Sequence, residues 1–167
     1  KRVTPDVEKG SYEFYRGFIQ GIFDSDGTVV GTQEKGLSVR LWQKDIDTLK
    51  VVQRMLGRMG IASTIYSNRK AEGSKSMPDG KGGLKDYNVK AGNELVISHI
   101  FSEILGFSSI RKQNRLRDGL SNYKRALNRE RFVADITEVI ELGKTEVFDV
   151  QVPGINAFDA NGIYVHN

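Results

Sequence analysis

Hydrophobic and polar positions in the first sixty residues follow two different periods. Apolar residues recur with helical spacing over 12–23 and again over 45–59, where Gly60 ends the run. Over 37–43, leucine and valine instead alternate with serine, arginine and tryptophan, which predicts a strand with one apolar face. A shorter strand is expected over 28–30. This part of the chain is therefore predicted to form a helix, two strands and a second helix.

Two strands and two helices are predicted in the next seventy residues. Strands are predicted over 61–67 and 86–91, and the intervening 70–84, with four glycines and a proline, indicates a loop or the tip of a long hairpin. Helices are predicted over 93–105 and 110–127. Up to residue 105 the region thus reads as α-β-β-α-β-β-α, and the basic helix over 110–127 follows.

From residue 132 onward the pattern predicts only short strands, over 132–142, 145–152 and 156–167. A change from mixed to all-β character favours two domains of different class. We therefore predict an α+β chain with one domain over 1–130 and a second over 131–167.

Composition narrows the possible functions. The 167 residues are 38% hydrophobic, with no cysteine and two histidines, which excludes disulfides, a thiolate zinc site and a cysteine nucleophile within the chain. No run of about 18 apolar residues occurs, so no membrane partner is expected. The N-terminal residues lack the apolar core of a signal peptide, and a cytoplasmic location is the expectation.

Charge is distributed unevenly along the chain. Residues 1–110 carry a net charge of +3, residues 111–131 carry +6, and residues 132–167 carry −5. The basic block is compatible with a solvated helix face and with a phosphate-binding stripe, and charge alone leaves both open. Within it, the side chains that could meet phosphates are Arg111, Arg115 and Lys124.

Two acids follow the first helix, at the end where negative charge opposes the helix dipole. Gly17 and Gly21, four residues apart on one face of that helix, indicate close approach of another backbone, because each glycine costs about 1 kcal/mol in a helix interior. Asp24 and Asp26, next to Gly27, could be compensated by Mg²⁺, which prefers carboxylate and water ligands. A simple Asx turn that closes the helix is the alternative.

The segment Ile19–Gly27 resembles the LAGLIDADG motif of homing endonucleases, and the element order over 12–127 resembles one repeat of that family. The resemblance implies double-stranded DNA as partner and Mg²⁺ as cofactor. It also implies that a second such helix packs against the first. Only one motif occurs in this chain, so a homodimer mate or an upstream half would have to supply the other.

The resemblance also assigns roles to single residues. Asp26 would be the catalytic metal ligand and Asp24 a supporting acid, while Gln43 and Lys112 match positions that assist catalysis. The sheet of the family grips the DNA major groove, and Arg40 and Trp42 would lie on that DNA-facing surface.

The C-terminal pair His166-Asn167 suits another reaction. An asparagine side-chain amide can attack its own backbone carbonyl and cleave the following peptide bond, provided that a neighbouring acid such as histidine assists. A chance dipeptide at a frayed terminus is the alternative.

Residues 147–167 resemble the C-terminal splicing blocks of inteins, through VFDVQV and NAFDANGIYVHN. The resemblance implies the C-terminal strands of a Hint splicing domain, with Asn167 as the cyclising nucleophile, His166 assisting it and Asp149 aiding acyl transfer. Asn156 stands where the family often has histidine, and it cannot donate a proton at pH 7. Residues 36–133 also resemble inteins of ribonucleotide reductases.

The N-terminal nucleophile of inteins and its Thr-x-x-His block do not occur in the chain, and no residue follows Asn167. The expected partners are therefore a missing N-terminal intein segment and the flanking extein of a host protein. We expect autocatalytic splicing combined with Mg²⁺-dependent DNA cleavage. The alternative is a homodimeric LAGLIDADG protein, or one that binds DNA and has lost catalysis.

Overall fold

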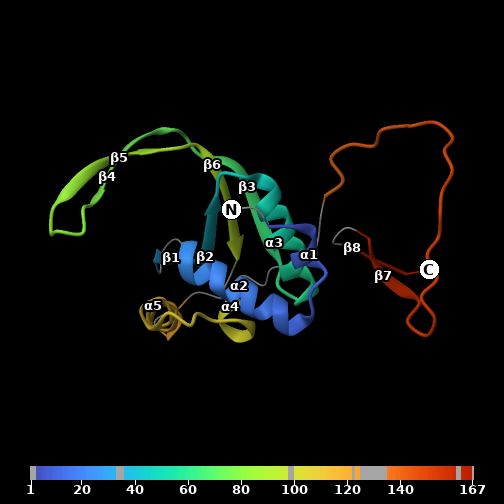
Figure 1. Ribbon diagram of the computed structural model, residues 1–167, viewed down its shortest axis with the longest axis horizontal. Helices are drawn as coiled ribbons and strands as arrows, with labels where there is room; N and C mark the ends of the chain where they lie inside the picture. Colours follow the sequence, from blue (N-terminus) through green and yellow to red (C-terminus); the bar gives the residue numbers. More distant parts are fainter. Residues whose placement is uncertain are drawn as a thin grey trace. The chain divides into compact units, whose positions relative to one another are not determined.

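The computed structural model describes residues 3–32, 36–97, 100–121, 123–124, 135–160 and 163–166. The chain divides into two units, Lys1–Glu130 and Arg131–Asn167, and each is described by itself. Figure 1 shows the elements of both units. The described part contains no helix that is long and apolar enough to cross a membrane.

The first unit is built on one antiparallel sheet. Its strands are β1 (Gly27–Thr32), β2 (Gly36–Gln43), β6 (Gly92–Ile97) and β3 (Ser63–Lys70), in that spatial order. Its helices are α1 (Pro5–Glu8), α2 (Tyr12–Asp26), α3 (Ile46–Arg58), α4 (Ile100–Ile104) and α5 (Ile110–Ser121). The predicted α+β class is confirmed.

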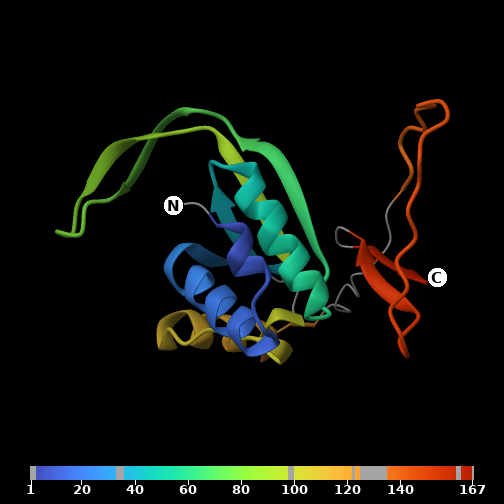
Figure 2. The same ribbon diagram turned by 45° about the vertical axis from the view of Figure 1, so that its right-hand side comes forward.

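The two faces of this sheet differ in character. Leu41 lies opposite Leu95, and Val39 lies opposite Ile97, and all four side chains are fully buried. Helices α2 and α3 pack on this apolar face (Figure 2) and complete the core with fully buried residues: Ile19, Phe23, Leu49, Val52, Met55 and Leu56. The opposite face of the sheet carries the alternating polar positions, as the sequence predicts.

The helix predicted over 93–105 is wrong. Residues Gly92–Ile97 form β6, which pairs with β2 on one side and β3 on the other, and only the short α4 follows. The side-chain amide of Asn93 donates to the carbonyl of Lys44 at 2.9 Å and its oxygen accepts from Asn68 N at 3.0 Å. A central strand in a short apolar run has no visible two-residue period, so sequence periodicity does not separate it from a buried helix.

A two-stranded arm leaves the sheet between β3 and β6. It consists of β4 (Gly73–Pro78) and β5 (Leu84–Val89), and Figures 1 and 2 show it extending away from the helices. Of the two forms predicted for 70–84, the structure therefore has the long hairpin. Its tip is closed by Asp79, whose Oδ1 accepts from Lys81 N at 2.7 Å and Gly83 N at 2.9 Å.

Within its described residues, the second unit contains one small hairpin, β7 (Ala157–Ala160) paired with β8 (Ile163–His166). The strands predicted over 132–142 and 145–152 are wrong for the described residues, since 135–152 is neither helix nor strand. Ile136, Val139 and Phe148 are each at least 85% exposed. The alternation predicts that one side of these segments will be buried, but a ladder also needs a neighbouring backbone, and these described residues have none.

Candidate active site

Helix α2 carries the candidate site at its C-terminal end. It begins after Ser11, whose Oγ accepts from Phe14 N at 3.3 Å and so caps the first turn. Tyr15, Ile19 and Phe23 form its buried side. This four-residue spacing fixes the rotation of the helix and leaves the two glycines of the sequence pattern on an exposed side.

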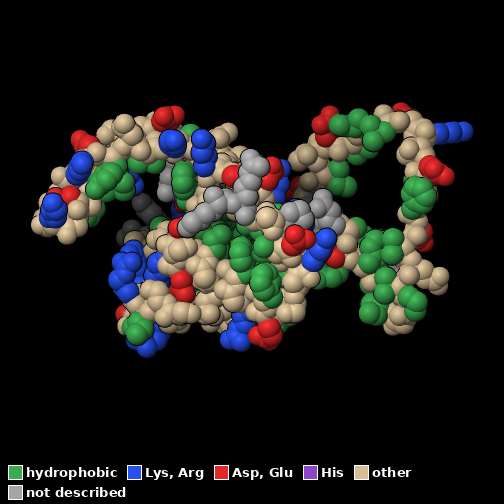
Figure 3. Space-filling view, in the orientation of Figure 1, with side chains coloured by type: hydrophobic (Ala, Val, Ile, Leu, Met, Phe, Trp, Pro, Cys, Tyr) green, Lys and Arg blue, Asp and Glu red, His purple; other side chains and the backbone are tan. Residues whose placement is uncertain are grey.

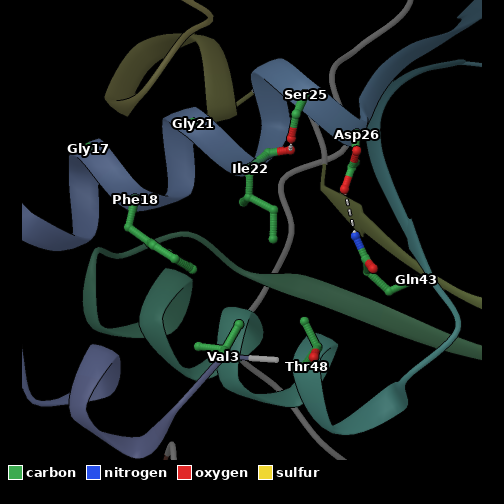
Figure 4. A pocket seen from close by; sticks show the side chains of 9 residues that line it. All are labelled: Val3, Gly17, Phe18, Gly21, Ile22, Ser25, Asp26, Gln43 and Thr48. Carbon is green, nitrogen blue, oxygen red and sulfur yellow. Dashed lines mark hydrogen bonds between the residues drawn. The ribbon is translucent and has the colours of Figure 1, made fainter. Parts of the chain in front are cut away.

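A groove of about 370 Å³ runs along that exposed side (Figure 4). A Cβ atom added to Gly17 or Gly21 would meet no atom within 4 Å. Close packing inside the described unit therefore does not account for these two glycines. The other residues that line the groove are Val3, Phe18, Ile22, Ser25, Asp26, Gln43 and Thr48.

The groove ends at two polar side chains that the sequence assigned to one site. Asp26 is the last residue of α2, and Gln43 is the last residue of β2. Gln43 Nε2 donates to Asp26 Oδ2 at 3.0 Å, and Asp26 is exposed (Figure 4). The structure thus brings these residues together and leaves the carboxylate accessible.

The helix continues three residues beyond its predicted end at 23, and this extension sets the position of Asp26. A Cβ atom on Gly27 would lie 2.5 Å from the carbonyl oxygen of Phe23, so only glycine permits the immediate turn from α2 into β1. The φ of Gly27 is −74°, which any residue can adopt. The requirement for glycine here is therefore space, not backbone conformation.

Asp24 has different partners from Asp26. Its two carboxylate oxygens accept from Ser108 N at 3.2 Å and Ser109 N at 3.1 Å, at the start of α5. The first backbone N–H groups of a helix lack partners within it and carry partial positive charge, so a carboxylate is well placed there. Asp24 thereby joins the end of α2 to the beginning of α5.

Lys112 lies at the C-terminal end of α2. Its Nζ donates to the carbonyls of Asp24 at 2.7 Å, Phe23 at 3.1 Å and Gly27 at 2.6 Å. Burial lowers the pKa of Lys112, while the charges of Asp24 and Asp26 act in the opposite direction. In the sequence, a metal ion was one way to compensate the two acids and an Asx turn was the alternative. In the structure, a lysine from α5 provides positive charge at this helix end.

The site offers limited but suitable ligands for Mg²⁺. No group of three or more His, Cys, Asp or Glu side chains within the described residues could hold a metal ion. Mg²⁺ is commonly bound by one or two carboxylates, with water and substrate phosphate completing its shell. The exposed carboxylate of Asp26, whose Oδ2 accepts from Gln43, fits that role, whereas both oxygens of Asp24 accept hydrogen bonds from the backbone.

The residues assigned to DNA contact lie on two surfaces of the first unit. Arg40 and Trp42 are on the polar face of the sheet, because they alternate with the buried Val39 and Leu41. Figure 3 shows Lys and Arg side chains gathered along the arm and over α5, with the surface hollowed between them. Arg111, Arg115 and Lys124 are exposed, and Lys124 lies beyond the end of α5.

Of the residues assigned to splicing, three are described in the second unit. Asn156 directly precedes Ala157, whose register partner is His166, and it has a positive φ of 49°. The exposed Asp149 accepts a hydrogen bond from its neighbour, Val150 N, at 2.9 Å. Asn167 lies outside the described residues. The structure therefore places Asn156 and His166 at the same end of the β7–β8 hairpin.

Residues 13–141 match the family of LAGLIDADG-like domains. The chain belongs to this family. The segment that resembles the motif of this family, Ile19–Gly27, lies in the second half of α2 and the first residue of β1.

Curated relatives align with nearly the whole chain. The ribonucleoside-diphosphate reductase NrdEB subunit alpha of Bacillus subtilis is 31% identical over 174 residues, which covers 99% of this chain and 16% of that protein. A DNA polymerase of Thermococcus litoralis is 29% identical over 92% of the chain and 9% of its own length. A DNA polymerase of Methanocaldococcus jannaschii is 28% identical over 89% of the chain and 9% of its own length. The chain thus spans less than a fifth of each of these relatives.

The contacts that fix the site are not visible in the sequence. The hydrogen bonds from Ser108 and Ser109 to Asp24 join residues more than 80 positions apart in the sequence, and no local pattern predicts them. The buried Glu94 was also missed. A single acid directly before a short apolar run, Leu95–Ile97, is the signal that could have identified it.

Proposed function

We propose that this chain is the C-terminal part of an intein that carries a LAGLIDADG endonuclease unit. The observation that carries the proposal is the alignment of nearly the whole chain with two enzyme classes of different chemistry. A reductase subunit and DNA polymerases match it over 9% to 16% of their own lengths. An element inserted into unrelated host proteins accounts for this distribution, and an intein of the ribonucleotide reductase type in a cytoplasmic host is our specific assignment.

The endonuclease activity is assigned to Asp26. Its exposed carboxylate would hold Mg²⁺, which acts as a Lewis acid on a DNA phosphate when bound. Gln43 orients the carboxylate through its 3.0 Å hydrogen bond. Asp24 and Lys112 fix the end of α2, so that the chain presents Asp26 to the backbone of double-stranded DNA from a rigid support.

A complete site requires a second motif helix. The exposed side of α2 supports this, since Gly17 and Gly21 leave room for another backbone to approach closely. The partner would be a second copy of the chain or an upstream half of the same protein. Asp26 at the end of the groove would then lie next to its counterpart, and each copy would serve one DNA strand.

Splicing is assigned to the second unit. The side-chain nitrogen of Asn167 bonds to its own carbonyl carbon and loses a proton to solvent. The bond to the next residue breaks, and His166 gives its proton to the leaving nitrogen. Asp149 aids acyl transfer, and Asn156 supports the hairpin end. The exposed Val147, Phe148 and Ile155 would be covered by the N-terminal intein segment that completes the Hint domain.

The splicing assignment is tested by extending the chain beyond Asn167 with a serine-led reporter. The N-terminal intein segment is coexpressed with its own extein, and intact masses are recorded. Ligated exteins that disappear with Asn167→Ala are the expected products. Reporter that stays attached in a folded pair would contradict the assignment.

A second candidate function is a DNA-binding protein, homodimeric or without catalysis. The open side of α2 favours self-association, and the single motif in the chain is compatible with it. A chain that remains monomeric on DNA would exclude the homodimer. Mg²⁺-dependent cutting that is lost in Asp26→Ala would exclude the inactive form.

A further inference from the structure

One acidic side chain is buried on the polar face of the sheet. Glu94 lies on β6, the strand with neighbours on both sides, and its residue is only 3% exposed. Its register partners are Trp42 on β2 and Tyr66 on β3. Glu94 therefore lies on the same face of the sheet as Arg40 and Trp42, the residues that the family resemblance assigns to DNA contact.

Two arginines converge on this carboxylate. Arg40 Nη1 lies 3.2 Å from Glu94 Oε2, and Arg69 Nε lies 3.1 Å from the same oxygen. Arg40 Nε also donates to Ser38 Oγ at 3.0 Å, and the guanidinium of Arg69 stacks 4.3 Å from the centre of the Tyr66 ring. Each arginine is thus held at two points.

The arginines still reach solvent. Their side chains are 25% and 35% exposed, against 4% for Glu94. Within the described residues, Nη2 of Arg40 and both Nη atoms of Arg69 make no hydrogen bond. The guanidinium N–H groups that face Glu94 and Ser38 are therefore hydrogen-bonded. The N–H groups on the other edge of each guanidinium, its outer edge, are available to a ligand.

Stability alone is a weak reason for this arrangement. A buried carboxylate loses its hydration, and apolar replacements of buried ion pairs are often as stable or more stable. The apolar core of the unit also lies on the other face of the sheet. What the carboxylate does provide is orientation, because it immobilises two long side chains that would otherwise sample many rotamers.

We propose that Glu94 is a positioning residue that presents Arg40 and Arg69 to two guanines in the DNA major groove. This rests on the DNA-binding function proposed above. The outer edge of an arginine matches the O6 and N7 acceptors of guanine in a two-bonded contact, which gives base specificity. Flexible lysines on the arm, such as Lys75 and Lys85, suit sequence-independent contacts with phosphates.

The test uses the full chain and a randomised DNA duplex library in low-salt buffer, followed by sequencing of the bound fraction. Wild type should select guanine at two positions. Glu94→Gln should lower that preference by about tenfold or more at both positions, because one good two-bonded pair discriminates by at least that much. Asp86→Asn on the arm removes the same charge without touching the arginines, and should leave base preference unchanged.

Two further variants decide the matter if Glu94→Gln does not fold. Arg40→Lys and Arg69→Lys keep the charge, and each should abolish selection at one of the two positions. Unchanged base preference in Glu94→Gln, or in both lysine variants, would overturn the proposal. Wild type that binds the library without base preference would overturn it while leaving DNA binding intact, whereas wild type that binds no duplex would overturn the DNA-binding function itself.

Discussion

The ammonium group of Lys112 lies 2.6 Å from the carbonyl oxygen of Gly27, immediately beyond the end of α2. Its further contacts with carbonyls of the last helical turn place one positive charge where the helix dipole is negative. The same turn carries Asp24 and Asp26. Lys112 therefore allows two acids to occupy an end of a helix that otherwise disfavours them.

Replacing this lysine should destabilise the first unit. Lys112→Met removes charged hydrogen bonds to backbone carbonyls, and we expect a loss of about 1.5–3 kcal/mol in the free energy of unfolding. Urea unfolding, followed by the fluorescence of Trp42, the only tryptophan, measures the change. Lys50→Met is the control, because Lys50 forms an exposed ion pair with Asp47, and should change stability by less than about 0.5 kcal/mol. Equal effects of the two variants would contradict the role assigned to Lys112.

The two acids of the motif should respond to substitution in opposite directions. Asp24→Ala leaves the N–H groups of Ser108 and Ser109 without their acceptor, which should cost about 1–2 kcal/mol. Asp26→Ala removes an exposed negative charge from a helix C-terminus, which should stabilise the unit by about 0.3–1 kcal/mol. The same unfolding assay measures both. A loss of stability in Asp26→Ala would show that its carboxylate serves the fold instead of a ligand.

Gly17 and Gly21 should favour the association of two chains, although they lower the stability of the helix that carries them. Gly21→Ala places its Cβ in open space, so we expect the isolated chain to gain about 0.5–1 kcal/mol of stability. We also expect weaker pairing of chains on DNA, measured by light scattering of the complex. Gly57→Ala on α3 likewise meets no atom within 4 Å and is the matched control: it should stabilise without affecting pairing. Unaltered pairing in Gly21→Ala would refute the packing role of this face.

The tip of the arm should be sensitive to acid. Backbone hydrogen bonds from Lys81 and Gly83 lower the pKa of Asp79 below its ordinary value of about 3.9. Because the folded-state pKa is the lower one, the carboxylate stabilises the turn above pH 3.9, and this contribution is lost as the pH falls through the lowered pKa. Amide NMR shifts of Lys81 and Gly83 should titrate with a midpoint below 3.9 and cease to titrate in Asp79→Asn. A midpoint at or above 3.9 would contradict this account of the turn.

The sequence predicts a helix or strand correctly where the hydrophobic periodicity within that element alone determines its structure. The helical spacing of the apolar residues over 12–23 predicts α2, and the alternation over 37–43 predicts β2 and the face that carries Arg40. Ser11 and Gly60 mark helix ends that the structure has. These features depend on neighbours within a few residues, which is the range that periodicity reports.

Prediction failed where distant segments decide the structure. Residues Gly92–Ile97 form a strand because β2 and β3 flank them. Their own sequence is equally compatible with a helix. Residues 135–152 have strand-like alternation but no neighbouring backbone in the part of the chain that the structure describes. The charge that compensates Asp24 and Asp26 comes from Lys112, more than 80 residues away, so local electrostatics suggested a metal ion instead.

Cleavage of duplex DNA that the chain has selected from a random library is the decisive test of Asp26 as the catalytic residue. Wild type and Asp26→Asn are compared with Mg²⁺ and with the metal removed by chelation, and binding is measured in parallel. We predict cutting by wild type only when Mg²⁺ is present, and retained binding with background cutting by Asp26→Asn. Equal cutting by wild type and Asp26→Asn would contradict the assignment of the active site to the end of α2.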